Sequence, residues 1–157
     1  MIKFKTLLLL LIFATVTNYS FSQTGFGKAE KINDNWKFIL QQTDKEELKD
    51  LENRQWNTIE LPHDWSVKEQ LSPTLASATG YLPGGIGWYR KQLFVPKERE
   101  NEKVYLYFEG VYNRSEVFVN GKSFGKRPNG YISFMYDATD AISFGTENTI
   151  TVKVDHS

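Results

Sequence analysis

Cysteine is absent from this chain of 157 residues, histidine and methionine each occur twice, and the 19 basic side chains equal the 19 acidic ones. The absence of thiols excludes disulfides, and two histidines without thiols form no visible metal-ligand cluster. A chain without a basic excess also lacks the charge that nucleic-acid binding requires. We therefore expect no metal, no cofactor and no nucleic-acid partner.

Long hydrophobic runs are also missing, except for one at the N-terminus. Lys3 and Lys5 precede an apolar run over residues 7–14, and mostly small or polar residues follow it up to Ser22. This is the order of a secretory signal peptide, and the run is shorter than the roughly 20 residues that span a bilayer. We predict a signal peptide over residues 1–22, with a membrane anchor as the alternative. The mature protein is then expected in the periplasm or outside the cell, without membrane association.

Removal of Lys3 and Lys5 from the 19 basic residues leaves 17 against 19 acidic ones, a small negative net charge. An exported protein without cysteine fits a bacterial envelope better than a small disulfide-stabilised eukaryotic module. We assign the remaining residues, 23–157, to one domain, because a chain of this length builds a single hydrophobic core.

The residues that are abundant point to β-structure. Aromatic side chains make up 15% of the sequence and lie mostly in short runs that alternate with polar residues, the period-2 sign of a half-buried strand. Asn120-Gly121 joins two such runs and predicts a type I′ hairpin turn. Strands are predicted over residues 32–40, 56–61, 88–95, 104–108, 116–119, 122–125, 131–136 and 149–154.

The remaining segments contain little helix. Residues 43–51 predict one or two helical turns, and residues 137–142 predict a capped turn. Residues 71–87 have no periodicity, and so long an irregular segment in a compact domain is usually functional or mobile. The whole pattern predicts an all-β sandwich of jelly-roll or Greek-key type.

Two short motifs resemble parts of known active sites. Gly121-Lys122-Ser123 lacks the first glycine of a phosphate-binding loop and follows a hairpin instead of opening a helix. His63-Asp64 has no evident partner nucleophile, so a hydrogen-bonded structural histidine beside Trp65 is the favoured interpretation. Neither motif indicates an active site.

A carboxylate pair is the remaining enzymatic possibility. A retaining glycosidase needs two acids about 5 Å apart in different environments. Most of the acids lie in charge-rich turns; the more interesting ones are Asp64, Glu109 and Asp155, and none has a sequence setting that looks catalytic. The residues alone therefore support an exported β-sandwich without an active site.

Five strings in a fixed order carry a resemblance to a known family. They are WKF at 36–38, LPHDW at 61–65, GYLPGGIGWYRK at 80–91, FEGV at 108–111 and VNG at 119–121. In this order the chain closely resembles the N-terminal sugar-binding domain of glycoside hydrolase family 2, in its β-galactosidase-like branch. The resemblance covers roughly residues 32–157.

The resemblance implies a jelly-roll, or galactose-binding-like, sandwich at the front of a multidomain enzyme. In the family an immunoglobulin-like domain and a (β/α)₈ barrel with both catalytic glutamates follow, and the first domain packs on them. The family's acid/base glutamate follows an asparagine, and the one Asn-Glu here, Asn101-Glu102, lies in a charged turn. The chain is therefore expected to be a non-catalytic, truncated part of an enzyme that hydrolyses terminal β-linked sugars such as galactosides. Because it stops directly after a strand, the last strand of the sandwich is expected to be missing.

The resemblance also implies a contribution to the sugar pocket of the barrel. It places this contribution in the loop before the strand that begins at Trp88. Glycines there would let backbone approach a ligand closely, and a tyrosine could stack or hydrogen-bond. The alternatives are a loop that only packs on neighbouring domains and, for the whole chain, a free-standing carbohydrate-binding or structural module. The predicted ligand-binding residues are Tyr81, Leu82, Pro83, Gly84 and Gly85.

Overall fold

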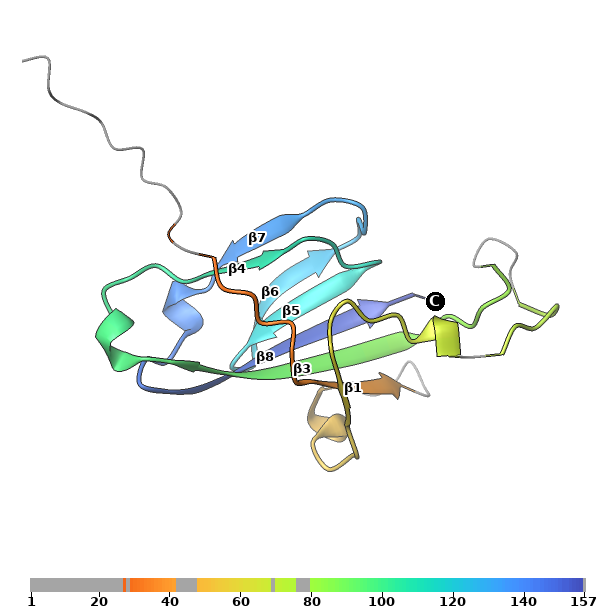
Figure 1. Ribbon diagram of the computed structural model, residues 1–157, viewed down its shortest axis with the longest axis horizontal. Coiled ribbons are helices and arrows are strands. Elements are labelled where there is room, and N and C mark those ends of the chain that lie inside the picture. Colours follow the sequence, from red (N-terminus) through yellow and green to blue (C-terminus); the bar gives the residue numbers. More distant parts are fainter. Residues whose placement is uncertain (1–26, 28, 42–47, 69, 76–79, 157) are drawn as a thin grey trace, which may run out of the picture. The chain divides into compact units, whose positions relative to one another are not determined.

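The computed structural model describes residues 27, 29–41, 48–68, 70–75 and 80–156, and the chain divides into two units, residues 1–32 and 33–157. Every strand that the structure describes lies in the second unit. Six strands form one antiparallel sheet in the order β2-β1-β3-β8-β5-β6, and two form a second sheet, β4-β7 (Figure 1). The strands are β1 Trp36–Gln41, β2 Asn57–Ile59, β3 Ile86–Val95, β4 Tyr105–Phe108, β5 Ser115–Val119, β6 Lys122–Arg127, β7 Phe134–Asp137 and β8 Thr146–Asp155.

Helical structure in the described residues is limited to single 3₁₀ turns, so the prediction of an all-β fold is confirmed. These turns are η1 Leu48–Leu51, η2 Ser66–Lys68, η4 Lys97–Arg99 and η5 Thr139–Ala141. The last of them confirms the predicted capped turn, since Asp137 Oδ1 accepts a hydrogen bond from the Thr139 amide at 3.0 Å. No helix among the described residues is long and apolar enough to cross a membrane.

The two sheets contact each other through aromatic side chains. The rings of Phe124 on β6 and Tyr136 on β7 lie 5.3 Å apart, and the guanidinium of Arg127 lies 4.5 Å above the ring of Phe134. Each buried apolar side chain stabilises the fold by roughly 1.5–3 kcal/mol, so such contacts hold the small β4-β7 sheet on the larger one.

The centre of the large sheet is the pair β3 and β8, which runs in register from Ile86 with Asp155 to Val95 with Thr146. The apolar positions of β8 alternate, as the sequence predicts, and they share one face with the valines of β5. This face is fully buried at Val117, Val119, Ile150, Val152 and Val154.

The opposite face of the large sheet is covered too. Ile39, Leu51 and Trp88 form a buried cluster, against which Trp56, Ile86 and Phe118 pack. The half-buried strand predicted over residues 32–40 begins only at Trp36, and burial of Ile39 covers its second face as well. Period-2 alternation missed this because Gln41, although polar, is buried and accepts a 2.8 Å hydrogen bond from Trp88 Nε1.

The hairpin β5-β6 confirms the predicted turn. Asn120 and Gly121 have φ values of 49° and 81°, the left-handed conformations of a type I′ turn. The Asn120 side chain also reaches the neighbouring strand: its Oδ1 accepts from the Thr149 amide at 2.9 Å, and its Nδ2 donates to Asn148 Oδ1 at 2.7 Å.

Several predictions differ from the structure, lie outside it or stay untested. Strand β7 begins at Phe134, three residues later than predicted, because residues 128–133 form a loop. Of the helical turns predicted over residues 43–51, only Leu48–Leu51 is described, as a 3₁₀ turn. The signal peptide over residues 1–22 lies outside the described residues, and the missing final strand stays a prediction.

Candidate functional site

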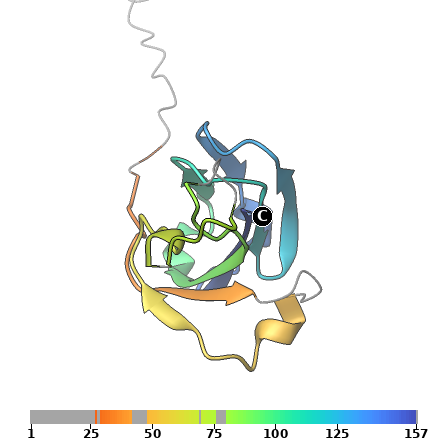
Figure 2. The ribbon, with the colours of Figure 1, turned by 90° about the vertical axis from the view of Figure 1, so that its right-hand side faces the viewer.

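The loop predicted to bind a ligand lies at the end of the large sheet where β3 begins and β8 ends, the end that faces the viewer in Figure 2. Gly80 and Tyr81 both have positive φ, 67° and 64°, and the Tyr81 carbonyl accepts a 3.0 Å hydrogen bond from the Ser72 amide. This bond joins the two described ends of the loop. The Tyr81 side chain is 47% exposed, whereas Leu82, Pro83 and Gly84 are half-buried.

Backbone hydrogen bonds fix the end of this loop to the last residues of β8. The Gly85 amide donates to the His156 carbonyl at 3.3 Å, and the His156 amide donates to the Gly85 carbonyl at 2.8 Å. Gly85 has φ 142°, a conformation that favours glycine. Gly85, the last of the predicted residues, thus continues the β3-β8 ladder.

Gly87 is required for a different reason, which is close packing. A Cβ atom at this position would lie 2.9 Å from Trp65 Cζ3 and 3.0 Å from Phe38 Cε2. The two rings therefore lie directly on the backbone of β3 and form the floor behind the loop.

An aromatic cluster continues from these rings. His63 contacts the Phe38 ring at a centroid distance of 4.7 Å, and its Nδ1 is 3.0 Å from the Tyr89 hydroxyl, so the prediction of a hydrogen-bonded structural histidine is confirmed. The pKa of His63 is lowered, mainly by burial and further by the positive charge of Lys68. The negative charge of Asp64 has the opposite, smaller effect. Burial also raises the pKa of Tyr89. Both groups are neutral at neutral pH.

His156 connects this cluster to a second pair of aromatic rings. Its ring lies 6.1 Å from Trp65 and 5.1 Å from Tyr112, both at steep angles, and Tyr112 in turn lies 5.3 Å from Tyr131. Four rings therefore form a row from the buried cluster to the surface, in the order Trp65, His156, Tyr112 and Tyr131. Tyr131, at the outer end of the row, is 84% exposed.

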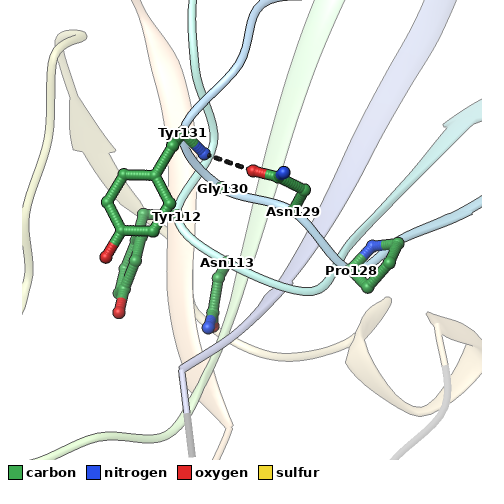
Figure 3. A pocket seen from close by; sticks show the side chains of 6 residues that line it. All are labelled: Tyr112, Asn113, Pro128, Asn129, Gly130 and Tyr131. Carbon is green, nitrogen blue, oxygen red and sulfur yellow. Dashed lines mark hydrogen bonds between the residues drawn. The ribbon is translucent and has the colours of Figure 1, made fainter.

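An open pocket of about 330 Å³ lies at the outer end of this row (Figure 3). One side of the pocket is the loop of residues 128–131. Its conformation is stabilised by Asn129, whose Oδ1 accepts a 2.8 Å hydrogen bond from the Tyr131 amide. A Cβ on Gly130 would lie 2.7 Å from the Tyr112 ring, so only glycine lets the two walls come this close. The lining residues are Tyr112, Asn113, Pro128, Asn129, Gly130 and Tyr131.

The pocket wall that contains Tyr112 and Asn113 is attached to β8 by Arg114. The guanidinium donates to Asp155 Oδ1 at 3.1 Å, and the Arg114 carbonyl accepts from the Asp155 amide at 3.4 Å. Asn113 Oδ1 is buried and has no hydrogen-bond partner among the described residues.

The two tyrosines of the pocket interact through their hydroxyl groups. The hydrogen bond between Tyr112 and Tyr131, followed by their coulombic interaction, raises the pKa of Tyr131.

The acids considered for catalysis have other partners or lie in solvent. Asp64 Oδ1 accepts hydrogen bonds from the Ser66 amide at 2.9 Å and the Ser66 hydroxyl at 2.6 Å, Asp155 pairs with Arg114, and Glu109 is exposed. Within the described ranges, no group of three or more histidine, cysteine or acidic side chains could hold a metal ion.

Through His156, which binds Gly85 and contacts Tyr112, the structure thus brings the predicted loop, residues 81–85, near a pocket that sequence reasoning missed. The missed residues are on two loops that are distant in sequence, residues 112–113 and 128–131, and alternation of apolar residues gives no signal for either. One signal was available: Pro128-Asn129-Gly130 is a turn sequence, which argues against a strand that begins directly after it, at residue 131.

A sequence comparison with protein families matches residues 29–156 to the family described as glycosyl hydrolases family 2, sugar binding domain. Among individual proteins, the chain is 40% identical over 127 residues to the beta-galactosidase BoGH2A of Bacteroides ovatus, covering 80% of this chain and 15% of that protein. It is 33% identical over 127 residues to a beta-glucuronidase of Formosa agariphila, covering 79% of this chain and 13% of that protein.

A solved structure gives the same result. The crystal structure of a beta-glycosidase from Bacteroides vulgatus superimposes with a TM-score of 0.69 at 41% identity, over 83% of this chain and 17% of that chain. The matched region therefore includes most of this chain but less than a fifth of the length of each of these relatives.

Proposed function

Because the chain belongs to the sugar-binding domain family of the family 2 glycosyl hydrolases, we propose that it is the non-catalytic, N-terminal sugar-binding and structural domain of an exported enzyme of β-galactosidase type. The observation that carries the proposal is the family match over residues 29–156. The enzyme would hydrolyse terminal β-linked sugars such as galactosides with glutamates of a barrel outside this chain. An immunoglobulin-like domain and that barrel are its expected packing partners.

The environment of the acids supports a non-catalytic role. A retaining glycosidase needs one free nucleophilic carboxylate and a second carboxyl about 5 Å away. Asp64 and Asp155 are instead held by Ser66 and Arg114. The chemistry of bond cleavage is therefore assigned to another part of the enzyme.

The loop before β3 supports the sugar-binding role. Its backbone is held on His156, and the half-exposed Tyr81 lies beyond that attachment with positive φ. A ring presented in this way can stack on a sugar or donate a hydrogen bond from its hydroxyl. We assign the ligand contacts of this loop to Tyr81, Leu82, Pro83, Gly84 and Gly85, in a pocket completed by the barrel.

The nucleotide sequence that follows codon 157 tests the proposal. We expect the same reading frame, or one shifted by a single lesion, to continue into an immunoglobulin-like segment and a barrel with an Asn-Glu motif. Intergenic sequence after codon 157 would contradict the proposal and favour a free-standing carbohydrate-binding module.

Export is tested separately. N-terminal sequencing of the protein made in a Gram-negative host should find a mature chain that begins near Gln23, in the periplasm or the medium. An intact N-terminus in the cytoplasm would contradict the predicted signal peptide.

A further inference from the structure

We propose that the pocket of Tyr112, Asn113, Pro128, Asn129, Gly130 and Tyr131 is a sugar subsite of its own, which takes one neutral pyranose residue. The inference rests on the proposed function for the class of ligand. It goes further in assigning a second place of contact, separate from the loop of residues 81–85, and in naming the charge and size of its occupant.

The aromatic pair provides the stacking surface. A pyranose ring has an apolar face of C–H groups, and such a face packs on the ring of an exposed tyrosine. Tyr131 is 84% exposed, while Tyr112 is held from behind by His156 at 5.1 Å. The Tyr131 ring is thus accessible to a ligand, and the Tyr112 ring is held in place by His156. This side of the pocket is therefore already formed in the free protein.

The polar groups of the pocket fit hydroxyls. The Oδ1 atom of Asn129 accepts the hydrogen bond of the Tyr131 amide at 2.8 Å, and because Asn129 is an exposed residue its amide group can also donate to a ligand. The side-chain amide of Asn113 and the phenol of Tyr112 complete the wall (Figure 3). Amides and phenols both donate and accept, as hydrogen bonding to a sugar hydroxyl requires.

The absence of charge from the lining sets the kind of sugar. None of the six lining residues has an acidic or basic side chain. Of the two arginines that adjoin the lining in sequence, Arg114 is paired with Asp155 at 3.1 Å and Arg127 lies 4.5 Å above the ring of Phe134. Recognition of a uronate would instead require a free cation, normally an arginine, facing the carboxylate. A neutral hexose is therefore the expected occupant.

The volume sets the number of sugar residues. Pockets for small molecules usually have volumes of roughly 300–1,000 Å³. The pocket here, at about 330 Å³, is at the lower end of that range. It has room for one pyranose residue, and the open side leaves a second residue in solvent.

Titration of the purified chain with methyl β-galactopyranoside, followed by calorimetry and by ligand-observed NMR, tests the inference. We expect a dissociation constant of about 1 mM, the affinity typical of a shallow site with a few contacts. Tyr131→Ala should weaken binding about tenfold, because it removes the stacking surface. The matched control is Tyr107→Ala, which removes a tyrosine that is 61% exposed on β4 and should leave binding unchanged. Methyl β-glucuronide should bind more weakly than the galactoside.

Each contrary result has a distinct meaning. No saturable binding to the unmodified chain, equal affinity in Tyr131→Ala, or tighter binding of the glucuronide would overturn the neutral-sugar subsite. If Tyr81→Ala abolishes binding while Tyr131→Ala does not, the proposed role of the loop stands and this inference fails. If binding depends on Tyr131 but intergenic sequence follows codon 157, the subsite stands and the proposed enzyme context fails.

Discussion

The two ends of the strand pair β5 and β8 differ in the side chains that surround them. At one end, where Val119 pairs with Ile150, the fully buried Asn148 side chain joins the hairpin to the turn before β8. At the other end, where Ser115 pairs with Val154, the chain opens into the aromatic row of Tyr112, His156 and Tyr131. At the first end, here called the closed end, the polar side chains have hydrogen-bond partners within the protein. At the second, the open end, aromatic rings and side-chain amides are accessible to a ligand.

The closed end derives its rigidity from a single amide. Asn148 Oδ1 accepts from Asn120 Nδ2 and from the Ser143 amide, both at 2.7 Å. Its Nδ2 lies 2.9 Å from the Ser143 carbonyl, 3.1 Å from that of Thr146 and 3.4 Å from that of Leu93. A buried amide that uses both lone pairs and both hydrogens loses no hydrogen bonding on folding.

Asn148→Ala should therefore have the largest effect on stability. It leaves several buried backbone and side-chain groups without partners, and we expect a loss of about 4 kcal/mol in the free energy of unfolding. Urea denaturation followed by tryptophan fluorescence measures this loss. The matched control is Asn129→Ala at the open end, which removes one exposed hydrogen bond and should cost about 1 kcal/mol or less. Equal losses in the two variants would show that the ends do not differ in this way.

Gly87→Ala should have the next largest effect, and it acts at the open end. The added methyl group would overlap the rings of Trp65 and Phe38, and overpacking of this kind costs about 2 kcal/mol. Gly110→Ala is a suitable control, because the nearest atom to its Cβ would be the Gly130 carbonyl oxygen at 3.8 Å. Urea denaturation should show little change for the control. A stable Gly87→Ala variant would mean that the floor behind the loop is loosely packed.

The sequence was informative where local rules act and uninformative where distant segments meet. Alternation of apolar residues predicted the strands, and Asn120-Gly121 predicted its turn, because both depend on neighbours in the chain. The buried role of Asn148 could not be predicted, since its partners come from the hairpin, β3 and the turn before β8. The aromatic row depends likewise on three separate segments, and only the family resemblance pointed to this end of the sheet.

His63 gives the open end a dependence on pH. Its pKa is lowered in the folded state from 6.5, mainly by burial, so the unfolded chain binds a proton more readily than the folded one below that pH. Stability from this residue is therefore complete above pH 6.5 and decreases as the pH falls toward the lowered value. His63→Gln, which keeps a polar partner for Tyr89 but does not titrate, should reduce the loss of stability between about pH 7 and about pH 5. An identical pH dependence in this variant and the unmodified chain would place the titration elsewhere.

Tyr131→Ala should have the smallest effect on stability, and that result is as informative as the largest. The side chain is 84% exposed, and its ring contact with Tyr112 adds little in water, so we expect a change within about 0.5 kcal/mol. Urea denaturation and thermal unfolding both measure it. The expected combination is normal stability with weakened sugar binding, because a residue kept for a ligand contributes to the complex and not to the fold. A loss near that of Asn148→Ala would show instead that Tyr131 closes the open end structurally, and its exposure would then be no sign of a binding surface.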